Sequence, residues 1–450
     1  MRALTEWLIS EIGFDQLISA VENGLCPAVV SGLDGIHRAH AAAVLRKGTN
    51  RPLVVICSDE AEQRRLAGDL EALTGEKAAL LTSRDFTFYN VEGASRQHEQ
   101  ERLRALYSMT RCAPITVTTI DGALQRTMPP GAMAKAVLEL KNGGTYKLEE
   151  VVDLLVRAGY SRTEQVEGPG QFALRGGILD VFSPAEEEPF RCEFFGDEVD
   201  SMSAFDVVTQ RRTEPIEKAL ILPAAEALPS LCDGEHGEGT KGLLQALRAL
   251  LSRIEKKRSG VAELKKNILA DIERLETGRI LPAADKYFEL LYPMACALDY
   301  FPPDALVVMS DAQRVSERAK NFLWQLGEDA SALLSAGVLE AGLVRFALDF
   351  ESFCLRLEEF PALMMESFTR SQYPLSPRKI FTFTTKQLPS YGGSVETAVG
   401  DITHYVKGEY VTIVLCKDER RASILSEFLL GKGISVTLDY TFQRRPAPGS

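Results

Sequence analysis

The sequence has few of the residues from which metal centres and disulfide frameworks are built. Its 450 residues include five histidines and eight cysteines. The cysteines lie at positions 26, 57, 112, 192, 232, 296, 354 and 416, so no two of them form a C-x-x-C pair. None has a ligand-like spacing to a histidine, and neither a zinc site nor a disulfide framework is therefore predicted. We expect reduced, mostly buried thiols and a cytoplasmic location.

Long apolar runs and excess positive charge are also missing. No window approaches the ~18 uncharged apolar residues of a membrane span, and residues 1–13 contain acids and no apolar core of a signal peptide. The net charge of −12 opposes binding to nucleic acid. Acids interleave with the basic run at 256–258, so a solvated face with salt bridges is expected there. The sequence predicts no membrane partner, and contact with DNA only through a local patch.

What is present is a pattern of packed α/β layers. The length predicts about three domains at ~150 residues each, and 45% of the residues are hydrophobic. Short apolar runs at 27–31, 52–58 and 114–119 alternate with segments of helical spacing. Such runs are typical of buried parallel strands, and the alternation predicts a doubly wound α/β layer.

The pattern changes near residue 128, where a small α+β insert is expected to begin. Long helices are predicted at 242–276, and a strand at 305–309 returns to the earlier α/β type. The last unit is expected to contain a strand at 411–416, a helix at 418–430 and a strand at 434–438.

One strand of the insert carries an unusual face. In residues 191–195, Cys192 and Phe194 point one way, whereas Arg191, Glu193 and Phe195 point the other. An arginine beside an aromatic ring is typical of an interface anchor. Arg175, which precedes a Gly-Gly turn, is expected to border the same surface. The alternative is a surface pair between Arg191 and Glu193, with Phe195 tucked under a loop.

If Arg191 and Phe195 lie outside the core, truncating either one should leave the stability within about 0.5 kcal/mol. Truncating Phe194 on the opposite face should cost about 3 kcal/mol or more.

The same segment matches a longer pattern, R-G-G-[IL]-[IL]-D-[IV]-F followed by P-x-R-x-[ED]-F-F-x-[DE]-E-[IV]-[DE]-S, at residues 175–182 and 189–201. It resembles the second domain of the transcription-repair coupling factor family (Mfd) and, more distantly, of the excision-repair protein UvrB. The resemblance implies that this domain docks the damage-recognition protein UvrA through Arg175, Arg191 and Phe195. Ser183 departs from the family, which usually has phenylalanine before the following proline.

The resemblance spans essentially the whole chain and implies a UvrB-like, split α/β domain. The implied division is residues 1–126 for the first half, 127–222 for the UvrA-docking α+β domain, 223–372 for the second half, and 373–450 for a small α/β domain of unknown role. The family's RNA-polymerase-binding and DNA-translocating domains, which use ATP and Mg²⁺, are expected beyond Ser450. The implied function is that of an adaptor with no enzymatic activity and no cofactor of its own.

The residues at the turn where a nucleotide site would lie are consistent with an adaptor that has no cofactor. A phosphate loop reads G-x-x-x-x-G-K-[ST], but no such run occurs, and the turn after the first strand carries Asp34 between Gly32 and Gly35. At the matching later strand end, Asp311 lacks a following glutamate. The alternative function, a UvrB-like ATP-dependent DNA helicase or repair subunit, needs the intact loop. A third possibility is a scaffold that binds another polar partner through the same arginines.

Overall fold

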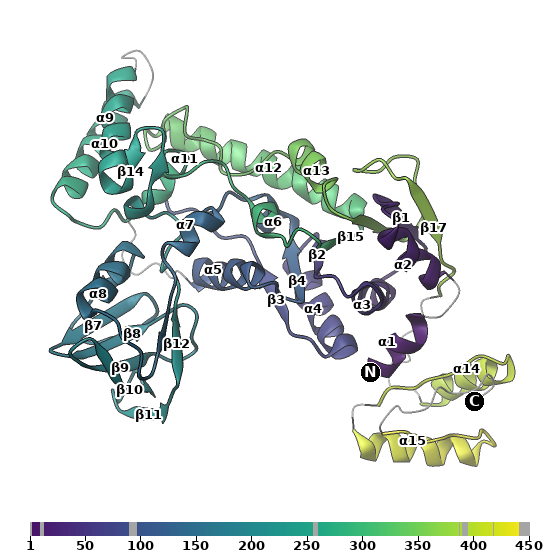
Figure 1. Ribbon diagram of the computed structural model, residues 1–450. Helices are drawn as coiled ribbons and strands as arrows, with labels where there is room; N and C mark the ends of the chain where they lie inside the picture. Colours follow the sequence, from purple (N-terminus) through teal and green to yellow (C-terminus); the bar gives the residue numbers. More distant parts are fainter. Residues whose placement is uncertain are drawn as a thin grey trace.

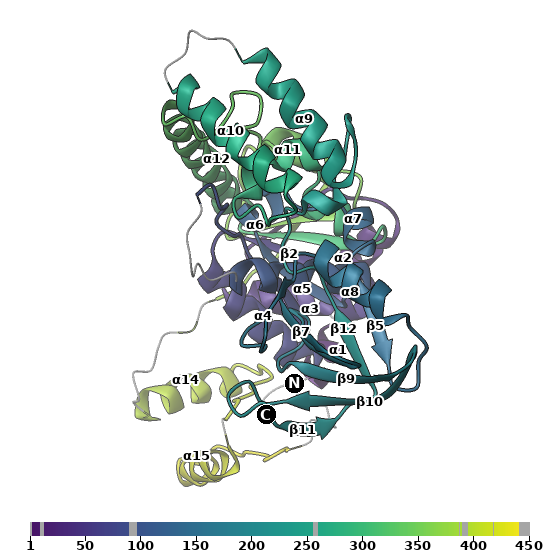
Figure 2. The same cartoon turned by 90° about the vertical axis from the view of Figure 1, so that its left-hand side faces the viewer.

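The computed structural model describes residues 2–9, 13–89, 97–254, 260–386, 388, 395–416 and 418–440. A large α/β body occupies the centre, a smaller β-rich body lies beside it, and two helices near the C-terminus lie apart from both (Figures 1 and 2). Among the described residues, no helix is long and apolar enough to cross a membrane. Six of the eight cysteines are buried, as predicted.

A seven-stranded parallel sheet forms the centre of the large body. Its strands follow the order β17-β1-β16-β15-β2-β4-β3. Their bounds are β1 Ala28–Ser31, β2 Leu53–Cys57, β3 Ala78–Leu81, β4 Ile115–Thr119, β15 Leu306–Ser310, β16 Ala362–Glu366 and β17 Lys379–Thr382. Because β15 and β16 lie between β1 and β2, the sheet is assembled from two distant parts of the sequence.

Helices cover both faces of this sheet, which confirms the predicted doubly wound α/β class (Figure 1). One face carries α1 Arg2–Ile9, α2 Phe14–Glu22, α3 Ile36–Thr49 and α4 Glu60–Thr74. The other carries α5 Gln97–Thr110, α6 Ile120–Leu124, α12 Ala312–Ser335 and α13 Phe350–Leu357. Alternate residues of β2 enter opposite cores, Val55 on the first side and Val54 on the second, because successive side chains of a strand point to opposite faces.

The β-rich body is inserted between the two parts of the large sheet. Its six strands follow the order β11-β10-β9-β8-β7-β6. Their bounds are β6 Ser161–Arg162, β7 Gln171–Arg175, β8 Ile178–Phe182, β9 Phe190–Phe195, β10 Glu198–Phe205 and β11 Arg212–Pro215. Helix α8, Leu148–Arg157, packs against one face of this sheet through Val151 and Leu155. The chain enters the body along β5, Leu138–Lys141, and leaves along β12, Lys218–Ile221, and these two strands pair antiparallel.

Helices α9, Gly239–Arg253, and α10, Val261–Glu276, confirm the helices predicted at 242–276, whereas the basic run at 256–258 lies outside the described residues. They lie at the opposite end of the molecule from β9 and β10 (Figure 2). The remaining elements are short: α7 Pro130–Ala134, α11 Phe288–Leu291, β13 Asp233–Gly234, β14 Gly237–Glu238, and the 3₁₀ helices Pro229–Leu231, Ala284–Tyr287 and Ala297–Tyr300.

The C-terminal part corrects the sequence analysis. Helix α15, Glu419–Gly431, confirms the helix predicted at 418–430, and it is preceded by α14, Val395–Lys407. The segments 411–416 and 434–438 are not strands, and most residues of the first are exposed. A strand needs a neighbour to accept its backbone hydrogen bonds, whereas here the apolar side chains of Val399, Leu429 and Ile434 form a small core of their own.

β17 lies beyond the expected boundary at residue 373, yet it pairs with β1 in the large sheet. The division of the chain into domains remains a proposal, and we amend it by placing the last boundary after Thr382.

A buried cluster of charges lies where the chain leaves the insert and re-enters the large body. Arg84 donates to Asp285 through Nη1 and Nη2, at 2.8 and 2.9 Å, and through Nε to Glu226 at 2.9 Å. The Arg102 Nε lies 3.1 Å from the same oxygen of Glu226, and the Thr127 hydroxyl donates to the other. Burial opposes the charge of Arg84, but the surrounding carboxylates raise its pKa well above the ordinary value. These residues come from both parts of the large body and from the exit of the insert.

Replacing Asp285 by alanine should therefore destabilise the protein severely. The change leaves Arg84 buried beside one fewer carboxylate, and breaking a buried pair typically costs about 3–5 kcal/mol. Urea unfolding of parent and variant measures the difference. The matched control is Arg248→Ala, which removes an exposed pair with Glu276 and should cost less than about 1 kcal/mol. Equal losses in the two variants would contradict the role given to the cluster.

Candidate docking surface on the inserted sheet

The inserted sheet turns one face to the core and leaves the other only partly covered. Along β9, Phe190 and Cys192 are buried, whereas Arg191 and Glu193 are only part-buried. Phe194 is half-buried and packs against the main core, while Phe195 at the end of the strand is 84% exposed. The predicted faces of β9 are thus confirmed, and the alternative in which a loop covers Phe195 is wrong.

Arg191 is held by a carboxylate on the neighbouring strand. Asp180 of β8 lies directly opposite Arg191, and the arginine donates to it twice, Nε to Oδ1 at 2.6 Å and Nη2 to Oδ2 at 2.8 Å. The guanidinium also stacks over the ring of Phe205 at 4.9 Å. Glu193, the partner in the alternative interpretation, instead pairs with Arg212. Hydrogen bonding to Asp180 raises the pKa of Arg191.

Arg175, on β7, also lies near the Asp180 carboxylate, on the opposite side of β8 from Arg191. Its Nη2 lies 3.7 Å from the Asp180 Oδ2 and also donates to the carbonyl of Glu164 at 3.2 Å. Half of the Arg175 side chain, 52%, remains exposed. The register aligns Arg175 with Ile178, itself partly exposed, so that the two border one edge of the surface.

The Gly-Gly turn brings this edge next to β9. Gly176 has a φ of +61°, which favours glycine. A Cβ on Gly177 would lie 2.7 Å from the carbonyl oxygen of Phe194, and the Phe194 N–H donates to the Gly177 carbonyl at 2.8 Å. The structure therefore places Arg175, Arg191 and Phe195 on one side of the sheet, with Asp180 beneath the two arginines.

Asp180 is the residue that the sequence analysis missed. It is only 2% exposed, and a buried carboxylate requires a charged or hydrogen-bonding partner. The alternation of side chains along β8 predicts its orientation. Leu179 and Val181 point to the core, so Asp180 must point to the face that carries the arginines.

At the carboxyl ends of β1, β15 and β16, where open parallel sheets commonly bind ligands, the structure places protein side chains. The Arg38 guanidinium donates to the Leu33 carbonyl, the Asp311 carboxylate and the Ser367 hydroxyl, each at 3.0 Å. The N–H of Leu33 donates to the carbonyl of Glu366 and is not free to bind phosphate.

Gly32 in this turn is pressed against another segment. It has a φ of +86°, and a Cβ there would lie 1.8 Å from the carbonyl oxygen of Phe383, the residue that follows β17. Gly32 thus lies in a strand-to-helix turn that is packed against Phe383, whereas a Cβ on Gly35 would meet only the Arg65 side chain, at 3.9 Å.

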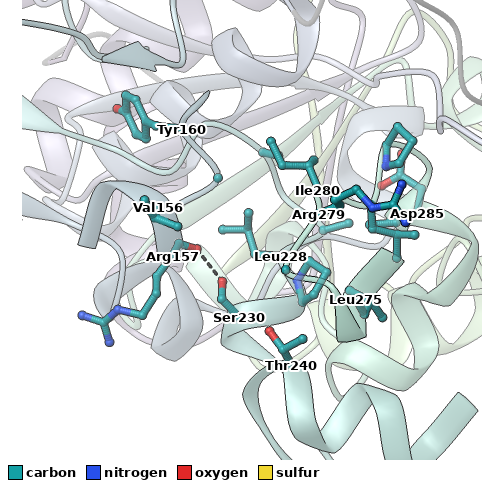
Figure 3. Close-up of a pocket in the computed structure, with 18 of the residues that line it drawn as sticks. Val156, Arg157, Tyr160, Leu228, Ser230, Thr240, Leu275, Arg279, Ile280 and Asp285 are labelled. Atoms are coloured by element: carbon teal, nitrogen blue, oxygen red, sulfur yellow. Dashed lines mark hydrogen bonds between the residues drawn. The ribbon is translucent and has the colours of Figure 1, made fainter. Parts of the chain in front are cut away.

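A cavity of about 460 Å³ lies between the inserted body and α10 (Figure 3). Its labelled apolar residues include Val156, Leu228, Leu275 and Ile280. Asp285 also lines it, but its carboxylate is engaged by Arg84. The Ser230 hydroxyl donates to the Arg157 carbonyl, as the dashed line in Figure 3 shows. The lining also includes the charged side chains of Glu99, Arg162 and Arg279.

The large parallel sheet with its inserted body is consistent with a UvrB-like α/β protein that carries a docking domain. A family model described as the UvrB interaction domain matches residues 138–226, which include the whole candidate surface. Over 94% of its length the chain is similar to a transcription-repair-coupling factor of Bacillus subtilis (strain 168), with 26% identity over 429 residues. A second relative with the same name, from Myxococcus xanthus, is 29% identical over 308 residues, or 65% of the chain. The resemblance inferred from the sequence is confirmed, and an N-terminal fragment of such a factor fits these matches.

The chain spans only part of these relatives, 36% of the length of the Bacillus subtilis protein and 25% of the Myxococcus xanthus protein.

The contacts of Arg191 change the effect on stability that we expect when this side chain is truncated to alanine. Arg191→Ala strands the carboxylate of Asp180 and should lower the free energy of unfolding by about 2 kcal/mol or more, rather than leaving it unchanged. Phe195→Ala removes an exposed ring and should stay within about 0.5 kcal/mol. Urea unfolding, with hydrogen exchange of β8 and β9 to localise the loss, distinguishes the two. An Arg191→Ala variant as stable as Phe195→Ala would show that Asp180 does not depend on this arginine.

Proposed function

We propose that this chain is the adaptor module of a transcription-repair coupling factor and recruits the nucleotide-excision-repair protein UvrA to stalled transcription complexes. The observation that carries the proposal is the exposed ring of Phe195 inside the segment that matches the UvrB interaction domain. Aromatic side chains are enriched at the buried centres of interfaces, and a phenylalanine can bury on the order of 150 Å² or more there.

The two arginines of this surface suit an acidic partner, and Glu198 lies opposite Phe195 in the strand register. Arg175 is half exposed on this face, and Arg191 is fixed on the same face by Asp180. UvrA as the partner rests on the family resemblance and on the match to the UvrB interaction domain. Contacts with RNA polymerase and with DNA are proposed for regions of the relatives that this chain does not include. A cytoplasmic location belongs to the same proposal.

The proposed adaptor has no ATPase activity. The turn after β1 lacks a lysine for phosphate, and Arg38 is already bonded to Asp311, the acid that a metal would need. Losing one electrostatic group of a catalytic site typically costs ~10²–10³ in rate, and here several are replaced. This packing disfavours the alternative of a UvrB-like ATP-dependent helicase or repair subunit.

Binding to UvrA should depend on Phe195. Phe195→Ala should weaken binding by about 2 kcal/mol, roughly 30-fold in Kd, with Arg175→Ala similar or somewhat smaller. Titration calorimetry with purified UvrA measures both. The matched control is Phe368→Ala, which removes a ring that is 75% exposed in the large body and should leave binding unchanged. Parent-like binding by Phe195→Ala would exclude this surface, and binding that is also lost in Phe368→Ala would show that the effect is not local.

Incubation of the purified chain with MgATP should release no phosphate above the blank. A coupled phosphate assay measures this, and Asp311→Ala should give the same result because Asp311 is committed to Arg38. Turnover at a rate comparable to that of motor ATPases would refute the assignment of this sheet edge.

A further inference from the structure

The guanidinium of Arg191 has donors that its contacts within the chain do not use. An arginine offers five N–H groups arranged along two edges. Asp180 takes the edge formed by Nε and Nη2, and the Gln210 carbonyl receives one long bond from Nη1 at 3.4 Å. The second edge, formed by the remaining N–H groups of Nη1 and Nη2, is therefore only weakly engaged, and 15% of the side chain is exposed.

The orientation of that edge is set by its surroundings. Asp180 fixes the guanidinium from β8, while the ring of Phe205 covers one of its planes. Without the carboxylate, the long arginine side chain would gain rotamer freedom, which a partner would have to remove on binding.

The local charge also favours a carboxylate as the ligand. Arg175 and Arg191 face a single carboxylate, Asp180, so one positive charge is left uncompensated within this group. The nearby Glu193 does not supply the missing negative charge, because it is paired with Arg212. A carboxylate on a partner would complete the set.

We propose that Asp180 is a positioning residue of the docking surface, which holds Arg191 by one edge so that the other edge receives a carboxylate of the bound partner. This inference rests on the proposed function, with UvrA as the partner. Phe195 supplies the apolar contact beside this ion pair, and Arg175 borders it from the other side.

A purely structural role for Asp180 makes a different prediction. If the Asp180–Arg191 pair served only to pack the sheet, a neutral pair of similar shape would restore both stability and binding. The double variant Asp180→Asn/Arg191→Gln provides this pair, because removing both members of a buried pair avoids leaving a lone charge. Under the positioning role, the double variant regains stability but not binding.

The test is calorimetric titration of the 450-residue chain and its variants with purified UvrA, alongside urea unfolding. Asp180→Asn should weaken binding at least about 10-fold, and Arg191→Lys should do the same although it keeps the charge, because an ammonium lacks the second edge. The double variant should bind no more weakly than the weaker-binding of its two single variants. Asp180 and Arg191 act as one unit, so either change already removes the contribution of both. In a variant that combines Phe195→Ala with Asp180→Asn, the fold-losses of affinity of the two single variants should multiply.

The matched control is Arg157→Gln, an exposed arginine on α8 against the opposite face of the sheet, and it should bind like the parent. Parent-like binding by Asp180→Asn, by Arg191→Lys or by the neutral double variant would overturn the positioning role while leaving the docking function intact. Absence of binding by the parent chain would overturn both. Because Arg191→Lys retains the charge opposite Asp180, it keeps the test decisive if Asp180→Asn does not fold.

Discussion

The buried contacts of Arg84 with Glu226 and Asp285 are the constraint on which the arrangement of the two bodies depends. Arg84 follows β3, Glu226 follows the exit of the insert, and Asp285 follows α10. A charge removed from water is tolerated only when it is paired. The cluster therefore couples the burial of each segment to that of the others, and the insert leaves the large body at a fixed place. A continuous apolar core and the bond from Arg104 Nε to the Pro184 carbonyl also join the two bodies.

The candidate docking surface applies the same principle on a smaller scale. A nearly buried carboxylate, Asp180, has two arginines around it, one held tightly and one half exposed. Residues on this surface consequently differ in what they contribute. Arg191 belongs both to the packing of the sheet and to its outer face, so its effects on stability and on docking are linked. Phe195 has no such tie, because its ring lies almost entirely in solvent.

At the carboxyl ends of its strands, the large sheet holds protein side chains that bond to each other. The parallel strands end side by side, as in nucleotide-binding proteins, and in that space Arg38 donates hydrogen bonds to Asp311 and to Ser367. The segment after β17 lies against Gly32 and closes the turn further. The ring of Phe195 on the inserted sheet, by contrast, is 84% exposed.

The sequence by itself determined what depends on neighbours along the chain. The period of two in β9 decided which side Phe195 faces, and the alternation of apolar runs with helical segments decided the α/β class, because both patterns are short-range. Only the tertiary structure decided which groups pair. The partner of Arg191 is Asp180 on another strand, and the register of β8 against β9 selects it over Glu193. Likewise, β17 is a strand because β1 offers it an edge, whereas 411–416 has equally apolar residues and no strand beside it in the described structure. Pairing needs a partner brought from far along the chain, and the local pattern does not specify that partner.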